Sequence, residues 1–223
     1  MKKIITLFLL TLVFYPELSA QSFSPDKRIT LYGSYTFDDS FDSYYDYGNY
    51  YQGKISDGML YGVGFEFEIR PSAYLELSYL RESTNAPTQY YTGGAFTKYN
   101  DFDVVMNYIM LGANHSFQKA GSKVEGFGGL SLGMAIVDIE HDDVNPAYDV
   151  SKNVTKFAWG LKAGAIIWAT PKFGVKLQAQ LLSVAQSIGG GCYFGTGGSG
   201  AGVSTYSSIY QFSLGGGLTY NFN

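Results

Sequence analysis

The amino-acid sequence predicts an all-β protein, and specifically a closed antiparallel eight-stranded up-and-down transmembrane β-barrel. The first observation is a repeated alternation of apolar residues with polar or small ones, which places the two kinds of side chain on opposite faces of a strand. The second is the composition, with 20 Tyr, 16 Phe and 28 Gly among 223 residues and a mean hydropathy of only −0.03. The third is a strict alternation of short and long connections between eight such segments, which is typical of membrane barrels.

Residues 1–20 are predicted to be a cleaved signal peptide, and residues 21–223 a single barrel domain. Two lysines precede a short apolar run, the run ends at Pro16, and small residues stand at Ser19 and Ala20. This is the arrangement of a secretory leader. An N-terminal membrane anchor is the alternative, but the apolar run is shorter than the roughly 20 residues of a spanning helix.

The first half of the chain predicts four strands, over residues 29–37, 58–69, 73–82 and 101–117. In the second of them one face is apolar, with Tyr61, Val63, Phe65, Phe67 and Ile69. The other face carries Gly62, Gly64, Glu66 and Glu68. The fourth strand is nearly apolar throughout, so its facing stays open. The preferred arrangement points outward the side chains of Ile109, Leu111, Ala113 and Phe117.

The second half predicts four more strands, over residues 123–137, 154–168, 173–185 and 206–222. The last is the closing strand, whose apolar face consists of Tyr210, Phe212, Leu214, Leu218, Tyr220 and Phe222. Its other face carries only small and polar residues. Because closure alone removes the unpaired edge of a strand, we expect this strand to pair with the first strand as well as with the seventh.

The connections differ in length and in charge. Short turns are predicted at residues 70–72, 118–122 and 170–172, and long connections at 38–57, 83–100, 138–153 and 186–205. The short-turn end carries Lys27, Arg28, Arg70, Lys119, Lys123 and Lys172, whereas the long connections carry most of the acidic residues. Short turns of membrane barrels are periplasmic and long loops extracellular, so both chain termini are expected on the periplasmic side.

The polar face is expected to line the lumen. In a soluble barrel, such as a lipocalin, this face would point to water and should carry more charge than it does. An eight-stranded barrel has room only for its own side chains, and small residues with a few paired charges suit that space. We expect an interior polar cluster of Glu66, Glu68, Glu76, Glu125, Lys162 and Lys176.

Taken together, the leader, the strand–turn plan, the Gly-rich run at 127–133 and the ending Tyr220-Asn221-Phe222 resemble a known family. It is the family of eight-stranded outer-membrane β-barrels of Gram-negative bacteria, similar to the transmembrane domain of outer membrane protein A and to stand-alone barrels of Bacteroidetes. The resemblance implies a location in the cell outer membrane, contact with outer-membrane lipid and insertion by the barrel assembly machinery. One departure is that Asn223 follows the terminal aromatic residue.

Little in the sequence indicates chemistry, and we expect no enzymatic activity, cofactor, metal site or nucleic-acid partner. His141 stands in an acidic stretch at 138–143, where it could activate water or help to hold a cation, but a solvated acidic loop is the simpler interpretation. The Gly-rich stretch at 189–200 lacks the Lys-Ser/Thr of a phosphate-binding loop. The single Cys192 excludes an intramolecular disulfide, and a net charge of −4 gives no basic signature.

The long connections suggest a surface role. Tyr mixed with Asp, Ser, Gly and Asn is the composition of adaptable recognition surfaces, and the candidate binding residues are Tyr44, Tyr45, Tyr47, Tyr50, Tyr51, Tyr90 and Tyr91. The alternative is that these tyrosines belong to an aromatic girdle or pack the loops. The predicted function is a barrel with a filled lumen and a structural or surface-binding role toward an extracellular glycan or protein. A narrow channel for ions or small solutes is the alternative, and a hydrolase at the rim is a distant third.

Overall fold

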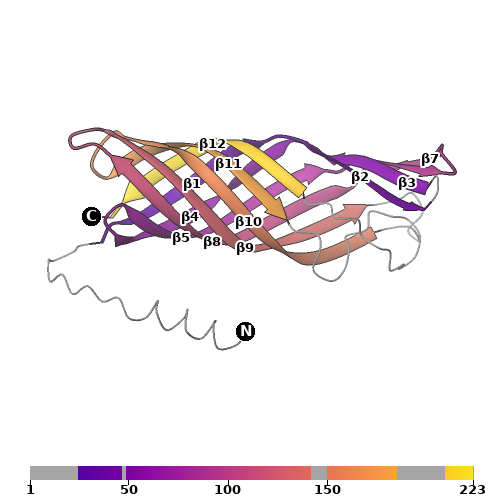
Figure 1. Ribbon diagram of the computed structural model, residues 1–223, viewed down its shortest axis with the longest axis horizontal. Helices are drawn as coiled ribbons and strands as arrows, with labels where there is room; N and C mark the ends of the chain where they lie inside the picture. The colour runs from indigo at the N-terminus through magenta and orange to yellow at the C-terminus, as the bar shows by residue number, and fades with distance from the viewer. Residues whose placement is uncertain (1–24, 47–48, 142–149, 185–208, 223) are drawn as a thin grey trace, which may run out of the picture.

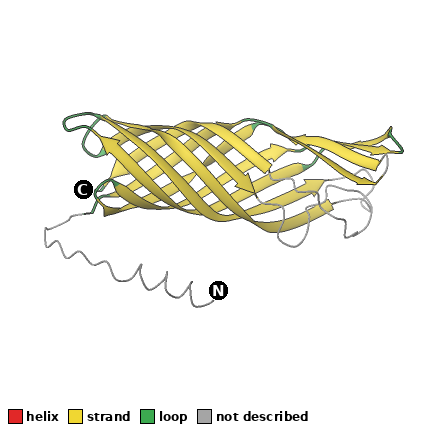
Figure 2. Cartoon of the chain, in the orientation of Figure 1, coloured by secondary structure: helices red, strands yellow, loops and turns green. Residues whose placement is uncertain are grey.

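The computed structural model describes residues 25–46, 49–141, 150–184 and 209–222, and within them it contains strands, turns and no helix (Figure 2). Eight strands form a closed antiparallel barrel in the order β1-β12-β11-β10-β9-β8-β5-β4 (Figure 1). The predicted fold class is therefore confirmed. The strands of the barrel are β1 (Lys27–Thr36), β4 (Gly58–Arg70), β5 (Ala73–Asn85), β8 (Asp103–Gln118), β9 (Val124–His141), β10 (Val150–Trp168), β11 (Phe173–Val184) and β12 (Ile209–Asn221).

The barrel closes between its first and last strands. Leu31 of β1 lies opposite Leu218 of β12, and Leu218 in turn lies opposite Val175 of β11. The pairing expected of the closing strand is thus confirmed. The three short turns lie at the same end of the barrel as the C-terminus (Figure 1). The predicted leader, residues 1–20, lies outside the described residues.

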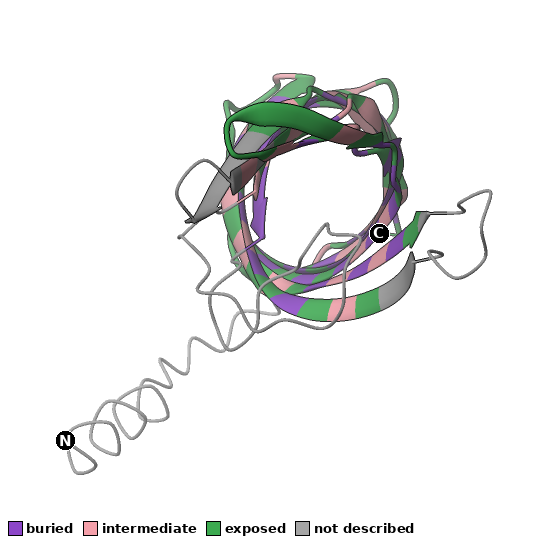
Figure 3. Ribbon diagram, turned by 90° about the vertical axis from the view of Figure 1, so that its right-hand side faces the viewer, coloured by how far each residue is buried: buried purple, intermediate pink, exposed green. Residues whose placement is uncertain are grey.

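The outer surface of the barrel is apolar over its middle. Side chains such as Leu132, Leu214 and Leu218 point outward, and Leu218 is 64% exposed. The facing left open for the fourth predicted strand is settled, because Ile109, Leu111 and Phe117 are all exposed. Buried and exposed residues alternate along barrel strands such as β1, β5 and β8 (Figure 3). A continuous apolar exterior around a polar interior is the polarity of a barrel that spans lipid. No helix in the described residues is long and apolar enough to cross a membrane.

A second sheet stands at the end opposite the short turns, and it corrects the interpretation of residues 38–57 and 83–100 as loops. It has the order β2-β3-β6-β7, and its strands are β2 (Asp39–Asp46), β3 (Asn49–Ile55), β6 (Thr88–Thr92) and β7 (Ala95–Asn100). The sequence hid these strands because tyrosines adjoin one another and are mixed with Asp, Asn and Gly, which favour turns and blur the period of two.

The second sheet continues one side of the barrel wall. Two residues separate β1 from β2, β3 from β4, β5 from β6 and β7 from β8. Backbone hydrogen bonds bridge these breaks, since Ser56 N donates to Asn85 O at 2.8 Å and Ala86 N donates to Phe102 O at 2.7 Å. In Figure 1 the sheet projects beyond the barrel along its long axis. Because the sequence leads us to expect this end outside the cell, we call it the extracellular sheet.

Strands β9 and β10 also extend further than predicted. Asp138 pairs with Asn153, and Glu140 with Ser151, so the predicted loop at 138–153 is wrong at both of its ends. In the described part of this extension Ile139 is buried, whereas the polar residues Asp138 and Glu140 occupy outward positions. The alternation expected of a lipid-facing strand, with apolar side chains outward, therefore does not mark it.

The polarity of the wall inverts toward the extracellular end. Arg81, Asn107 and Asp138 occupy outward positions, whereas Val104, Met106, Val137 and Ile139 are buried inside. With Leu80, Tyr108 and others these residues form one apolar core. An apolar interior with a polar exterior is the stable arrangement of a barrel wall in water, so we infer that this part stands outside the lipid. The lipid belt therefore ends near the level of Arg81.

Candidate functional site

The lumen at the level of the lipid belt is filled by a polar group that we call the lumen cluster, which consists of Tyr32, Glu66, Glu76, Asn114, Lys162 and Lys176. Strands β4 and β5 place Glu66 directly opposite Glu76. Two like charges in this position destabilise a sheet, so the pair requires compensation from the rest of the lumen.

Asn114, Lys162 and Lys176 supply that compensation. Asn114 Nδ2 donates to Glu66 Oε1 and to Glu76 Oε2, at 2.7 Å each. Lys162 Nζ forms an ion pair with Glu76 Oε2, and Lys176 Nζ lies 3.1 Å from Glu66 Oε1. Two carboxylates and two ammonium groups leave the cluster formally neutral.

Aromatic rings and glycines complete its packing. Tyr32 Oη donates to Glu76 Oε1 at 2.7 Å, and Lys176 Nζ lies 4.5 Å from the centre of the Phe127 ring, which favours the cation. A Cβ at Gly64 would approach Glu76 Oε1 to 2.7 Å, and one at Gly129 would overlap the Asn114 amide. The glycines of these strands thus make room for the large polar side chains opposite them.

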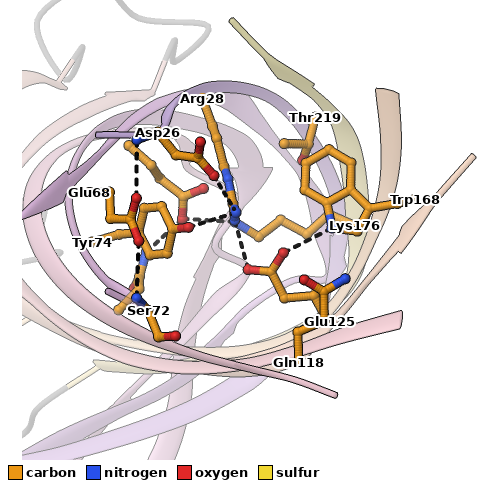
Figure 4. A network of polar contacts seen from close by, with 12 residues as sticks. Asp26, Arg28, Glu68, Ser72, Tyr74, Gln118, Glu125, Trp168, Lys176 and Thr219 are labelled. Carbon is orange, nitrogen blue, oxygen red and sulfur yellow. Dashed lines mark hydrogen bonds and ion pairs between the residues drawn. The ribbon is translucent and has the colours of Figure 1, made fainter. Parts of the chain in front are cut away.

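A second group, the mouth network, lies at the short-turn end of the lumen, which we expect to be the periplasmic end. It consists of Asp26, Arg28, Tyr74, Glu125 and Trp168 (Figure 4). Arg28 Nη1 donates to Glu125 Oε1 at 2.7 Å, and Arg28 Nη2 donates to Tyr74 Oη at 2.6 Å. Trp168 Nε1 donates to Glu125 Oε2 at 2.8 Å. Asp26 adds an ion pair with Arg28 at 3.3 Å. The guanidinium therefore meets two carboxylates and two aromatic rings at once.

A vestibule of about 440 Å³ opens beside this network, with Arg28, Gln118, Lys123, Glu125 and Trp168 among its lining residues. Farther along the lumen Glu66, Glu76 and Lys176 are buried. The space that is open at the periplasmic mouth thus gives way to packed side chains at the level of the lumen cluster.

The structure divides the six residues predicted to form one interior cluster. Glu66, Glu76, Lys162 and Lys176 lie together, whereas Glu125 belongs to the mouth network. Glu68 lies at the rim, where its carboxylate accepts from Asp26 N and Ser72 N at 3.1 Å each.

Sequence reasoning missed Arg28, which it placed before the first strand. Arg28 is in fact the second residue of β1 and is buried in the lumen. A usable signal existed, because Arg28 has the same parity along the strand as Thr30 and Tyr32, and the period of two therefore assigns it to the inner face.

The candidate surface tyrosines also do not form one group, because the described ones lie on different faces of the extracellular sheet. The rings of Tyr50 and Tyr91 stack with centres 4.4 Å apart, and Phe96 meets Tyr91 edge-on at 6.0 Å. Tyr90 is buried on the other face of the sheet. The remaining candidates, Tyr44, Tyr45, Tyr47 and Tyr51, have side chains that lie outside what the structure describes, as do those of His141 and Cys192.

No protein-family model matches the chain, and no curated protein matches its sequence. The fold, however, is similar to that of solved outer-membrane proteins. For OprG from Pseudomonas aeruginosa the TM-score is 0.58 at 13% identity, covering 89% of this chain and 96% of that one. For Neisserial surface protein A it is 0.51 at 13% identity, covering 89% and 97%. For the outer membrane protease OmpT from Escherichia coli it is 0.50 at 11% identity, covering 92% and 99%.

Proposed function

We propose that this chain, which has the fold of the outer-membrane β-barrels, is a closed barrel of the cell outer membrane that holds a rigid binding surface for a glycan or a protein outside the cell. The main observation behind this proposal is that the barrel wall continues into the extracellular sheet. Four strands of the barrel wall continue into the extracellular sheet, and backbone hydrogen bonds bridge the breaks between them.

The packing of the lumen supports the closed barrel over a narrow channel. A solute at the level of the lumen cluster would have to separate ion pairs such as Lys176–Glu66 and Lys162–Glu76, whose side chains are at most 9% exposed. Taking one member of a buried pair away leaves an uncompensated charge and costs about 3–5 kcal/mol. A barrier of this kind favours a plug over a pore.

The outer face of the extracellular sheet supports the binding role. Phe96 and Tyr99 are 57% and 52% exposed, and the stacked pair Tyr50–Tyr91 lies on the same part of the sheet. Rigid aromatic side chains give a large contact area at a low cost in conformational entropy. The exposed amides of Gln52 and Gln89 lie beside them, and amides supply both hydrogen-bond donors and acceptors.

The proposed role is not enzymatic. The charged residues Glu66, Glu76, Lys162 and Lys176 are paired with one another inside the lumen cluster, and Arg28 and Glu125 are paired in the mouth network. Contact with outer-membrane lipid and insertion by the barrel assembly machinery belong to the same proposal.

Conductance in planar lipid bilayers tests the closed lumen. The wild-type barrel is expected to give no stable current steps. The matched control is the E66A/E76A/K162A/K176A variant, which empties the lumen cluster and, once folded, should conduct ions. Stable ohmic steps from the wild-type protein would contradict the closed barrel.

Binding of the refolded barrel to arrays of glycans and extracellular proteins tests the surface. Removal of two rings of the extracellular sheet, in Y91A/F96A, is expected to lower any binding at least tenfold. The control is F117A, which removes an equally exposed aromatic ring near the opposite end of the barrel. Binding that F117A weakens as much as Y91A/F96A would assign the interaction to something other than the extracellular sheet.

A further inference from the structure

One carboxyl group of the lumen belongs to neither the lumen cluster nor the mouth network. Glu82 lies on β5 above the lumen cluster and is 0% exposed. Its cross-strand neighbours are Leu60 and Met106, and both are buried members of the apolar core. An acidic side chain is thus enclosed by apolar surface on two sides.

Glu82 has no counterion among the described residues. Neither of its carboxylate oxygens has a hydrogen bond of good geometry. The polar groups that act on it are the neutral Thr36 hydroxyl and Gln211 amide, and no cationic side chain is among them. Lys162 and Lys176 are paired inside the lumen cluster. An isolated ionised carboxylate in apolar surroundings is very unfavourable, so this group requires a proton or a bound cation.

Further oxygen atoms stand beside it. Thr36 and Ser213 lie opposite each other in β1 and β12, and the hydroxyl of each is buried without a hydrogen-bond partner. The Glu82 carboxyl lies next to the Thr36 hydroxyl and the Gln211 amide. The oxygen of that amide accepts a hydrogen bond from Tyr108 Oη, so it is not counted among the free oxygens. A Cβ on Gly58, the other cross-strand neighbour of Thr36, would lie 3.2 Å from Glu82 Oε1. Three strands therefore bring unpartnered oxygens to one side of the lumen.

We propose that Glu82, Thr36 and Ser213 bind a small monovalent cation, Na⁺ being the probe of choice, inside the lumen on the extracellular side of the lumen cluster. Carboxylate and hydroxyl oxygens are ligands that hard cations prefer. A charge of +1 balances the one carboxylate. A divalent ion would leave a net positive charge in an apolar core, which favours the monovalent ion.

The thermal unfolding midpoint of the refolded barrel, followed by the loss of its compact gel form, tests the proposal. Measurements in NaCl and in choline chloride at equal ionic strength and neutral pH separate ion binding from screening. Wild-type protein is expected to gain about 2–4 °C, in a saturable manner, on going from choline to Na⁺, because a ligand that binds only the folded state stabilises it. E82Q should lose this gain. The matched control is E68Q, which removes a carboxylate at the periplasmic rim and should keep it.

Each outcome decides the question. A Na⁺-specific gain that E82Q abolishes and E68Q retains supports the site. Equal midpoints in Na⁺ and choline for wild-type protein mean that Glu82 carries a proton, and they overturn the proposal. A gain that persists in E82Q overturns it as well. If E82Q does not fold, T36V decides, because it keeps the carboxylate and removes one oxygen ligand: a weaker response to Na⁺ supports the site and an unchanged response overturns it.

Discussion

Replacing Lys176 by Met is expected to lower the free energy of unfolding of the barrel by about 3–5 kcal/mol, the range for breaking a buried ion pair. Lys176 is 1% exposed and lies 3.1 Å from Glu66 Oε1, and it also donates to Tyr32 Oη at 3.3 Å. Methionine fills a similar volume but leaves Glu66, opposite a second carboxylate, without its ammonium partner. The upper end of the range is therefore the better expectation.

The second change, E66Q in the K176M background, should recover much of this loss. Without the charge of Glu66 the lumen cluster is again neutral, and the amide can still accept the hydrogen bond from Asn114. The double-mutant cycle is expected to give a coupling energy of about 2–3 kcal/mol between positions 66 and 176, as for residues in one hydrogen-bonded network.

Urea unfolding of the barrel in phospholipid vesicles, followed by tryptophan fluorescence, measures these differences. The matched control is K54M, which removes the lysine of an exposed ion pair, Lys54–Asp38, whose side chains are 47% and 56% exposed. Such a pair contributes at most about 1 kcal/mol. The lumen cluster does not stabilise the barrel in the manner described if K176M lowers the free energy of unfolding no more than K54M does. The same conclusion follows if the double variant is as unstable as K176M alone.

Three further outcomes are expected. Gly129→Ala should cost about 1–3 kcal/mol by overpacking the lumen cluster, whereas Gly128→Ala, on the outer face with only one atom at 4.0 Å, should be nearly neutral in the same urea assay. Leu132→Arg places a charge on the lipid face and should cost about 2–4 kcal/mol near the midplane, visible as a smaller folded fraction in vesicles but not in a soluble-barrel alternative. Tyr91→Ala removes the stack on Tyr50, worth about 0.5–1.5 kcal/mol, and should speed hydrogen exchange in β3 and β6 while leaving the barrel strands unchanged; exchange that rises everywhere would contradict a separate role for the extracellular sheet.

The facing of the barrel strands could be predicted because the period of two survives wherever one face meets lipid. Tyr61 and Phe67 on β4, and Phe212 and Leu214 on β12, are assigned to the apolar, outward face from the sequence and are exposed in the structure. Closure between the first and last strands followed from the same reasoning, because an open edge is not tolerated in lipid.

The pairing of charges in the lumen could not be predicted in detail. Lys176 and Glu66 are 110 residues apart, and Asn114 bridges carboxylates on two other strands. Which inward residues share a level depends on the tilt and stagger of the strands, and the alternation pattern carries neither. For the same reason, sequence reasoning did not bring Glu82 together with the hydroxyls of Thr36 and Ser213. The strands β1 and β12, which carry the two hydroxyls, become neighbours only when the barrel closes.

The two-residue breaks between the barrel and the extracellular sheet determine how the protein carries mechanical load. Ladder hydrogen bonds run perpendicular to the strands, so a pull on the sheet along the barrel axis has a large component in shear across many bonds at once. Bonds such as Ser56 N to Asn85 O and Ala86 N to Phe102 O share that load, and no flexible tether gives way first. A force applied at the tip of the sheet would therefore be transmitted directly to the membrane-embedded strands. Sheet and barrel would resist that force as one mechanical unit.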